Sequence, residues 1–488
     1  MFVAIIHYHL RPCGVTRIIE QTVSALTKDN NHVVVFTGEP TEPDSALFKY
    51  ARLIDGLSYE QRSFCPHSAD LVSRLLKEAK ACFGRYPDIW HFHNHSLGKN
   101  CALSCAVRLL ALKGQKILLQ IHDFAEDLRP ELFRNLLEKI GNGKVSALSN
   151  WLYPQAAHIH YATINMRDYS LLAQAGVPGS RIHFLPNPVT YNVSRAKPVE
   201  KKVFYKEKLF LYCTRAIRRK NIGEFLLWSS VGAPEERYAI TRAPKNPAQR
   251  PIYDNWLSFA KDCKLNVEFE FGSRSKLDLT QLLHSAYATV TTSIAEGFGM
   301  EFLEPWLFMR PVLGRKLPEI TGDFEDNGLN LSSMYSRLLL PLKWIDKQLL
   351  FKKICTAYKS LSSAYNRAFH VQNAEKALAA AIEAGSIDFG RLDEELQQRI
   401  IRKVAGSSIM RKELNPKTLF EKADISRVLE YNREQVRCNY ALEDYSKKLS
   451  DAYAAVANSE VESVESGFDI NVLLDAFLAP ERFYLLRS

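Results

Sequence analysis

The sequence contains no hydrophobic run that approaches the ~18 apolar residues a membrane-spanning helix needs. Its start, MFVAIIHYHL, is apolar, but no basic segment precedes it, His7 and His9 end it, and no small-residue cleavage site follows. These features predict a first β-strand rather than a signal peptide. We therefore expect a cytoplasmic protein.

Paired cysteine spacings are also missing. The nine cysteines are scattered and odd in number, which argues against a disulfide framework. Cys101 and Cys105 lie one helical turn apart, without a second Cys/His pair to complete a zinc site, and His91, His93 and His95 alternate along an expected strand without an adjoining carboxylate. No Asp-x-Asp motif follows an expected strand either. We predict no metal site and no cofactor.

The sequence contains fewer acidic than basic residues. It has 54 Asp and Glu and 64 Lys and Arg, which gives a net charge of +10. Such a balance suits nucleic acid, an anionic membrane surface or a phosphorylated ligand. The basic residues are mostly dispersed, and the clearest cluster, RAKPVEKKVFYKEK at 195–208, contains proline and mixed charge, which is typical of a linker. We expect no nucleic-acid partner and leave peripheral membrane contact and the oligomeric state open.

The sequence does contain two series of short apolar runs separated by helical patterns. The runs before the linker are FVAIIHY, HVVVFTG, DIWHFHN, KILLQIHD and HIHYATI, and those after it are KLFLYCTR, RYAITRAP, NVEFEFG and ATVTTS. This alternation predicts an α/β protein with two parallel sheets wrapped by helices. The expected parts are a first lobe at 1–195, a linker at 196–208, a second lobe at 209–388 and a helical extension at 389–488 that packs back on the lobes.

Open parallel sheets bind ligands at the carboxyl ends of their strands, so we examined the residues that follow each run. Gly14 precedes a helix after the first strand, and His122 ends a later one. Arg215 and Lys220, five residues apart, could neutralise a diphosphate from two sides, although an exposed basic loop is the plainer interpretation. A lone histidine is likewise more often structural than functional.

The stretch TTSIAEGFGMEFLEPW, at 291–306, places two carboxylates around a glycine turn that opens a helix. Helix-start amides can approach a ligand beside Gly297 and Gly299, and Glu296 and Glu304 can accept hydrogen bonds from vicinal hydroxyls such as those of a sugar or ribose. The alternative is that Glu296 caps the turn and Glu304 faces solvent.

Together with LPNPV at 185–189 and PEI at 318–320, these motifs resemble the retaining GT-B glycosyltransferases of the group 1 (family 4) type over roughly residues 1–325. The resemblance implies a GT-B fold with two Rossmann-like lobes facing a cleft, a nucleotide-sugar donor held mainly by the second lobe, and no required metal. It implies transfer of a hexose to an unidentified small-molecule, saccharide or lipid-linked hydroxyl acceptor with retention of configuration. A sugar-nucleotide hydrolase, epimerase or phosphorylase, or a non-catalytic binding module, remains the alternative.

The resemblance also assigns roles to single residues. It implies that Arg215 and Lys220 bind the donor diphosphate, that Glu296 and His122 lie beside the transferred sugar, and that Glu304 binds the ribose. The remaining donor-binding positions that it implies are Gly14, Gly297, Phe298, Gly299 and Met300. This chain departs from the usual family pattern at Cys13, Thr214 and Glu301.

Overall fold

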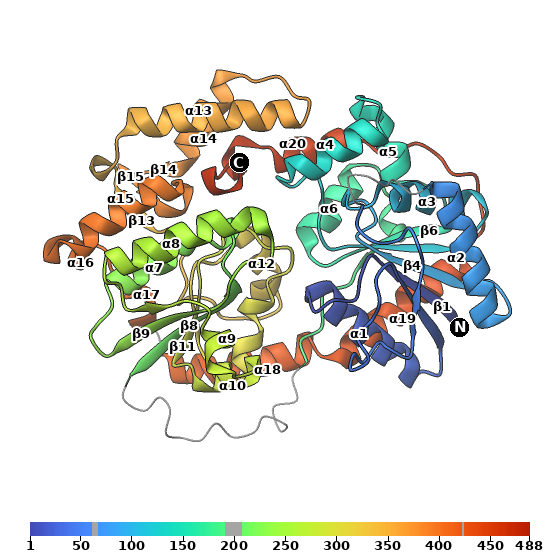
Figure 1. The fold of residues 1–488 in the computed structure, drawn as a ribbon, viewed down its shortest axis with the longest axis horizontal. Coiled ribbons are helices and arrows are strands. Elements are labelled where there is room, and N and C mark those ends of the chain that lie inside the picture. The colour runs from blue at the N-terminus through green and yellow to red at the C-terminus, as the bar shows by residue number, and fades with distance from the viewer. Residues whose placement is uncertain (61–66, 191–206, 422–423) are drawn as a thin grey trace. The chain divides into compact units, whose positions relative to one another are not determined.

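The chain folds into two α/β units, as the computed structural model shows (Figure 1). The structure describes residues 1–60, 67–190, 207–421 and 424–488. The first unit comprises Met1–Pro188, Leu361–Ala368 and Tyr440–Ala479, and the second comprises Val189–Ser360, Phe369–Asn439 and Pro480–Ser488. The predicted α/β class with two Rossmann-like lobes is confirmed. None of the helices in these described ranges is long and apolar enough to cross a membrane.

A seven-stranded parallel sheet forms the centre of the first unit, in the order β3-β2-β1-β4-β5-β6-β7. Its strands are β1 (Phe2–His7), β2 (His32–Thr37), β3 (Ala51–Leu53), β4 (Ile89–His93), β5 (Ile117–Ile121), β6 (Ile159–Thr163) and β7 (Ile182–Phe184). The connecting helices are α1 (Gly14–Lys28), α2 (Ser68–Phe83), α3 (Cys101–Leu112), α4 (Pro130–Lys139), α5 (Val145–Leu152) and α6 (Met166–Gln174). Every residue of β4, β5 and β6 is buried, as expected of strands covered on both faces.

The second unit contains a five-stranded parallel sheet in the order β10-β9-β8-β11-β12. The strands are β8 (Lys208–Arg215), β9 (Glu236–Arg242), β10 (Val267–Glu268), β11 (Ala288–Thr291) and β12 (Val312–Gly314). The helices between and after them are α7 (Ile222–Ser230), α8 (Arg250–Asp262), α9 (Phe271–Ser275), α10 (Leu279–Ser285), α11 (Glu304–Leu307) and α12 (Pro318–Asp326).

The structure assigns the C-terminal region differently from the predicted extension at 389–488. A small antiparallel sheet precedes it, with β13 (Leu339–Pro341), β14 (Ile382–Glu383) and β15 (Ser386–Asp388). The later helices are α13 (Lys347–Ala364), α14 (Val371–Ala381), α15 (Glu394–Ala405), α16 (Ser408–Glu413), α17 (Thr418–Glu421), α18 (Ile425–Asn439), α19 (Leu442–Asn458) and α20 (Ile470–Phe477). These helices are divided between the two units and form no third domain.

Helix α19 completes the core of the first unit, where it lies beside α1 and against β4 and β5 (Figure 1). Its apolar face buries four large side chains against the sheet: Tyr445, Leu449, Tyr453 and Val456. The helix is amphipathic, so burial of this face in the sheet explains why the segment joins the first unit rather than forming a separate extension.

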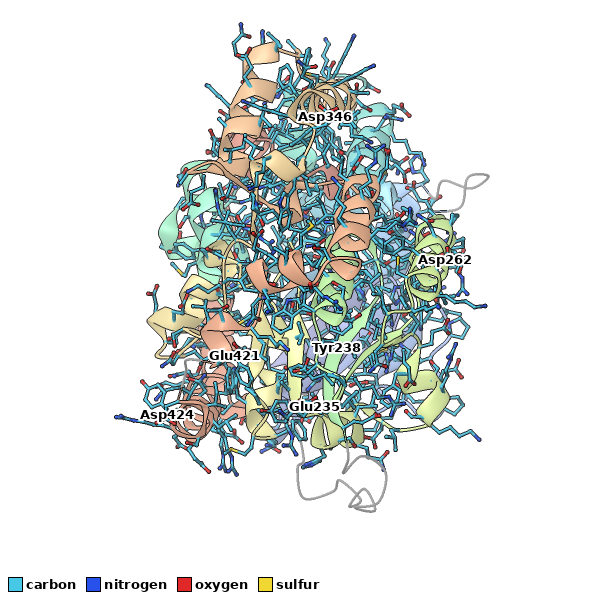
Figure 2. All side chains as sticks on the ribbon, turned by 90° about the vertical axis from the view of Figure 1, so that its left-hand side faces the viewer. Glu235, Tyr238, Asp262, Asp346, Glu421 and Asp424 are labelled. Carbon is cyan, nitrogen blue, oxygen red and sulfur yellow. The ribbon has the colours of Figure 1, made fainter. Side chains whose placement is uncertain are left out.

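A buried ion pair holds the segment before α17 to the second sheet. The Lys417 ammonium contacts both carboxylate oxygens of Glu236 at 2.7 and 2.8 Å, and Glu236 is the first residue of β9. The Tyr238 hydroxyl donates to the same carboxylate at 2.8 Å. Figure 2 labels Tyr238 and the neighbouring Glu235 at this end of the strand. The predicted linker at 196–208 lies outside the described residues up to 206, and its last residue, Lys208, begins β8.

Candidate active site

In the first unit, the end of β1 and the start of α1 form an open turn. Cys13 is the N-cap of α1, and its sulfur accepts a hydrogen bond from the Thr16 backbone N–H at 3.5 Å. A Cβ added to Gly14 would meet no atom within 4 Å, so space is open in front of the first turn of the helix. Gly14 therefore lies where the sequence analysis expects it, at a strand-to-helix turn with room for a ligand.

His122 follows β5 and is buried, with 5% of its surface exposed. Its Nε2 lies 2.9 Å from Nδ1 of His93, and its backbone N–H donates to the Asn94 side chain at 2.8 Å. Burial lowers the pKa of His122 to about 4, although nearby Asp123 opposes the shift. The imidazole is therefore neutral near pH 7, and it can hydrogen-bond to a hydroxyl without carrying charge.

The three alternating histidines near β4 are each held by protein groups. His91 contacts the Tyr453 hydroxyl at 2.8 Å and the Gln120 side chain at 3.0 Å, and the His95 Nε2 lies 2.7 Å from the Leu152 carbonyl oxygen. His93 pairs with His122. These contacts fix the orientation of each imidazole in the HFHNH run.

Three cationic side chains follow the strands of the first sheet: Arg11, Lys99 and Arg129. The sequence analysis did not predict that they form a group. The Lys99 ammonium lies 5.2 Å from the centre of the Tyr59 ring, and the Arg11 guanidinium lies 5.9 Å from it. Burial lowers the pKa of Lys99, and the neighbouring positive charge of Arg129 lowers it further. Arg129 in turn pairs with Asp123. These cations lie in loops after β1, β4 and β5, so their common location is visible only in the folded sheet.

Lys220 occupies the centre of the candidate site in the second unit. It ends a short 3₁₀ helix, η3 (Arg218–Lys220), and is 7% exposed. Its ammonium donates to Glu296 at 2.5 Å and to Glu301 at 2.6 Å. Burial alone would lower the pKa of Lys220, but the two carboxylates outweigh that effect and raise it well above its usual value. Lys220 is therefore a fixed positive charge and not a general base.

Glu296 accepts a second charged hydrogen bond, from the Arg219 guanidinium at 2.7 Å. Burial would raise the pKa of this carboxyl, but Arg219 and Lys220 lower it to about 2. Glu296 is thus ionised at any pH at which the protein is used. Its carboxylate is engaged by two cations, which differs from the alternative in which it only caps the turn.

Glu301, the unexpected acid, belongs to the same network. Besides Lys220, it accepts hydrogen bonds from the Thr291 hydroxyl at 2.8 Å and the Ser293 hydroxyl at 2.9 Å. Ser293 also contacts the Tyr212 hydroxyl at 2.9 Å. The sequence signal for Glu301 was its departure from the family pattern, whereas nothing local in the sequence indicates that Thr291, Ser293 and Tyr212 support it.

Glu304 begins α11 and is 8% exposed, so it does not face solvent. It lines a cavity of about 100 Å³, together with Glu301, Met300 and Tyr212 among others. The structure therefore brings Met300 and Glu304 to one small cavity directly behind the Lys220 network. Arg215, the last residue of β8, is half-buried at the carboxyl edge of the same sheet.

The turn between the two acids requires glycine at one position. Gly299 has a φ of +89°, and a Cβ there would lie 2.6 Å from the Phe302 ring. Phe298 is buried and packs edge-on against Phe324, while Gly297 is half-buried in the same turn. The 3₁₀ turn η5 (Met300–Phe302) follows directly. The backbone thus reverses tightly between Glu296 and Glu301, which is why both carboxylates reach one lysine.

Two α/β units, each with a parallel sheet and with polar side chains at the carboxyl edge of that sheet, are the features of the GT-B fold. Comparison with known proteins confirms the resemblance inferred from the motifs: residues 12–192 match the model of Glycosyltransferase Family 4. Over 518 aligned residues, the chain is 26% identical to a mannosylglucosyl-3-phosphoglycerate synthase of Petrotoga mobilis, covering 99% of each sequence.

Solved structures show the same fold at low sequence identity. Sucrose-phosphate synthase from Thermosynechococcus elongatus matches with a TM-score of 0.55 and 14% identity, covering 93% of this chain and 98% of that one. The Anabaena HepE protein, solved in complex with UDP and glucose, matches with a TM-score of 0.57 and 11% identity, covering 93% and 99%. These structures show that the chain has a fold of two Rossmann-like lobes, and the match over residues 12–192 and the relative from Petrotoga mobilis support a glycosyltransferase.

Proposed function

We propose that this protein transfers a hexose from a nucleotide-diphosphate sugar to a hydroxyl acceptor, with retention of anomeric configuration and without a divalent metal at the diphosphate. The observation that carries the proposal is the buried Lys220 network, with Arg219, Glu296 and Glu301 in contact and Arg215 at the adjoining strand end. Fixed cations of this kind stabilise the charge that develops on a leaving diphosphate.

The donor is held, on this proposal, by residues of the second unit. Arg215 and Lys220 bind the diphosphate, backbone amides of the Gly297–Met300 turn approach the sugar, and Glu304 accepts hydrogen bonds from the ribose. The HepE structure, which contains UDP and glucose in a related fold, supports a nucleotide-sugar donor. His122 and Gly14 belong to the first unit and are proposed to contact the sugar and the phosphates, respectively.

The leaving diphosphate is proposed to act as the base. Lys220 has a raised pKa and stays protonated, and Glu296 has a pKa near 2 and is already engaged by two cations, so neither is suited to take up the acceptor's proton. A phosphate oxygen that leaves on the same face as the incoming hydroxyl can accept that proton instead. The carbon–oxygen bond to phosphate breaks as the bond to the acceptor forms, and configuration is retained.

The acceptor is proposed to carry an acidic group. The relative from Petrotoga mobilis is named for a product that contains 3-phosphoglycerate, which is anionic near pH 7. Arg11 and Lys99, which lie over the Tyr59 ring, and Arg129, whose charge acts on Lys99, supply matching charge in the first unit. Repulsion between Lys99 and Arg129 would be relieved when a phosphate or carboxylate binds between them.

The proposal is tested by incubating purified protein with UDP-, GDP- and ADP-sugars, with and without phosphorylated and neutral hydroxyl acceptors. We expect product only when an acceptor is present, and NMR should show the anomeric configuration of the donor in that product. Turnover without added magnesium or manganese should equal turnover with either ion added. Donor loss without any acceptor would favour a hydrolase or epimerase, and inverted product or strict dependence on magnesium or manganese would contradict the proposal.

A further inference from the structure

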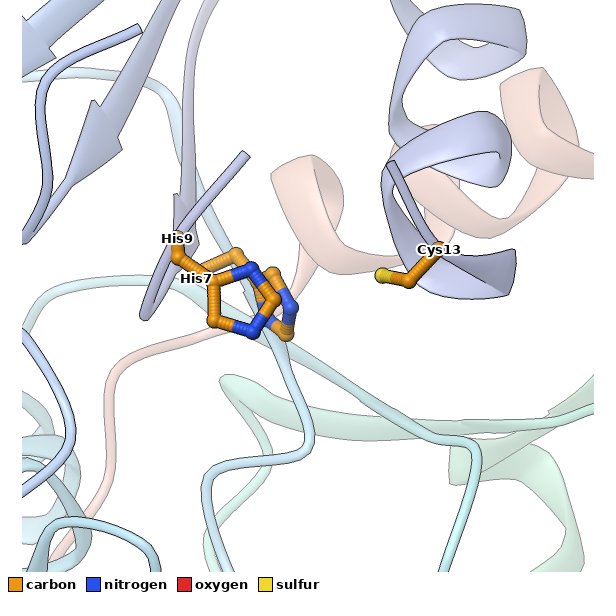
Figure 3. Close-up of side chains that lie close together, drawn as sticks. All are labelled: His7, His9 and Cys13. Carbon is orange, nitrogen blue, oxygen red and sulfur yellow. The ribbon is translucent and has the colours of Figure 1, made fainter. Parts of the chain in front are cut away.

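Two histidines and a cysteine meet in the loop that connects β1 to α1. His7 ends β1, His9 follows two residues later, and Cys13 caps α1. One ligand atom from each of the three lies within 4.8 Å of the other two. Figure 3 shows the Cys13 sulfur pointing toward the two imidazole rings. The spacing His-x-His-x₃-Cys therefore gathers three metal-ligating groups within seven residues.

Each imidazole has one buried nitrogen without a partner among the described residues: Nδ1 of His7 and Nδ1 of His9. The His7 ring hydrogen-bonds to the backbone of His93, and the His9 Nε2 lies 3.2 Å from the Tyr59 hydroxyl. Metal-binding histidines typically have this arrangement, with one nitrogen held by a neighbouring group and the other free to bind the ion. These two nitrogens are therefore available to a ligand, and they lie beside the Cys13 sulfur.

We propose that His7, His9 and Cys13 bind one zinc ion through the two Nδ1 atoms and the thiolate sulfur, with a fourth position open to water or to an acceptor oxygen. A nitrogen–nitrogen–sulfur set suits zinc and excludes magnesium and calcium, which prefer oxygen. Binding replaces the thiol S–H bond by a zinc–sulfur bond and releases the proton to solvent.

The required adjustment is small. Tetrahedral zinc with bond lengths of about 2.0–2.3 Å places its ligand atoms roughly 3.5 Å apart, compared with the 4.8 Å limit found for these three. Rotation of the Cys13 side chain away from the Thr16 hydroxyl, which it contacts at 3.2 Å, brings the sulfur inward. The resulting thiolate stays at the N-terminus of α1, where the helix dipole stabilises negative charge.

This zinc ion lies in the first unit and is separate from the diphosphate chemistry proposed for Lys220. It would fix the loop that ends at Gly14, and thereby the opening turn of α1. The two proposals fail independently, because metal content and zinc affinity can be measured without donor, acceptor or turnover.

The test is a zinc titration of the full-length protein after dialysis against EDTA, with a chromophoric chelator as competitor. We expect one tight equivalent in the wild type and a higher thermal midpoint when zinc is bound. With cobalt in place of zinc, we expect a thiolate-to-cobalt charge-transfer band in the near ultraviolet. Absence of a tight equivalent in the wild type would overturn the proposal.

Cys13→Ser is the most informative variant, because serine is a good N-cap and keeps the start of α1 while removing the thiolate. We expect this variant to fold with an unchanged midpoint in EDTA, and to lose both the zinc-dependent rise and the cobalt band. Cys82→Ser, a half-buried cysteine on α2, is the matched control and should keep both. Equal zinc binding by the two variants would contradict the assignment.

Tyr59→Phe removes only the hydroxyl beside His9. Loss of such a supporting hydrogen bond typically weakens metal binding about 10–100-fold. We therefore expect this variant to bind one zinc ion with correspondingly lower affinity and to retain the cobalt–thiolate band. Unchanged affinity would show that His9 does not bind the metal through Nδ1.

Discussion

Two clusters of buried polar side chains, one in each unit, differ in charge state. In the first unit, His91, His95 and His122 are neutral, because burial lowers their pKa values to between about 3 and 4. In the second, Lys220 and Glu296 are both charged, because each lies against an opposite charge. An imidazole can lose its proton at modest cost, whereas a buried lysine must be either paired or neutralised.

This difference suggests a division of labour. Neutral imidazoles can orient hydroxyls or bind a metal ion without repelling either ligand. Paired cations can hold a diphosphate and are already positioned when its charge increases in the transition state. Substitutions and pH changes can test whether the first unit depends on neutral imidazoles and the second on paired charges.

Lys220→Met should have the largest effect. Arg219 still pairs with Glu296, but Glu301 loses Lys220, and removal of one partner of a buried ion pair typically costs about 3–5 kcal/mol of stability. Turnover should fall by about 10³-fold or more, because the developing charge on the diphosphate loses a fixed partner. Urea unfolding and steady-state kinetics with varied donor measure the two effects.

A double variant separates folding from chemistry in that experiment. Lys220→Met combined with Glu301→Gln removes the stranded carboxylate, and should recover part of the lost stability while turnover stays low. If activity recovers together with stability, Lys220 is only structural and the charge-based account of the second unit is wrong.

Acid should destabilise the protein mainly through the first unit. His91, His95 and His122 have folded pKa values of about 3, 4 and 4, below the value of 6.5 expected in the unfolded chain. The unfolded state therefore binds more protons, and the stability that these groups contribute above pH 6.5 is lost as the pH falls toward 4. Each should remove about 1 kcal/mol between pH 6.5 and 5.5.

Urea unfolding at pH 7.5, 6.5 and 5.5 measures this slope. His95→Asn should flatten it, since His95 has no role in the proposed chemistry and contacts the Leu152 carbonyl. His67→Asn on the surface is a control that should leave the slope unchanged. A wild-type slope that is flat over this range would mean that the buried imidazoles are not neutral by burial.

Glu296→Gln and Glu304→Gln should change different kinetic constants. Glu296→Gln removes the charge beside the transferred sugar and should lower kcat about 10²-fold, with near-normal binding of the bare nucleoside diphosphate. Glu304→Gln weakens a contact present before and during reaction, and should chiefly raise KM for the donor. Calorimetry with the nucleoside diphosphate and steady-state kinetics make the comparison.

Each of these two variants is the control for the other, because both replace a glutamate of the candidate site by glutamine. Diphosphate binding should weaken in Glu304→Gln and not in Glu296→Gln, and both proteins should keep the wild-type unfolding midpoint within a few degrees. Normal turnover of Glu296→Gln, or wild-type diphosphate binding by both variants, would mean that the two acids have been assigned wrongly.

The smallest effect is expected from Glu301→Gln. Lys220 keeps Glu296 as its partner, so folding should change little, and removal of one negative charge should tighten diphosphate binding by roughly 3–10-fold. Weaker binding would show that Glu301 orients Lys220 rather than competing with the diphosphate for it. Thermal shift with the bare nucleoside diphosphate is sufficient to distinguish the two outcomes.

Local sequence patterns predicted the elements that depend on local order. The runs FVAIIHY, KILLQIHD and KLFLYCTR became β1, β5 and β8, because alternating or continuous apolar residues fit a covered strand. The small sheet of β13 to β15 was missed, since its strands have only two or three residues and depend on pairing with distant segments. Helix α19 was predicted as a helix. Its place in the first unit could not be predicted, because it depends on the sheet against which the apolar face of the helix packs.

In the candidate site too, local sequence patterns predicted some features and could not predict contacts between distant segments. Positions such as Arg215, Lys220 and Glu296 could be predicted because each follows a strand or a glycine turn. The pairing of Lys220 with Glu301 could not, because 81 residues separate them and the contact depends on the order of the strands. The His7, His9 and Cys13 group does not have the spacing of a helix or of a conventional zinc motif. Its members converge across a strand-to-helix loop, so sequence spacing alone did not predict it.

Helix α19 also has a consequence for how the protein is made. The last strand of the first sheet leaves the ribosome early, but Tyr440–Ala479, which complete that unit, follow only after the chain has reached residue 479. At a synthesis rate of about 5–20 residues per second, the sheet waits on the order of 15–60 s for its final helix. During that interval, the apolar surface destined for Tyr445, Leu449 and Tyr453 is uncovered. The nascent first lobe should therefore be a chaperone client until residues 440–479 have emerged.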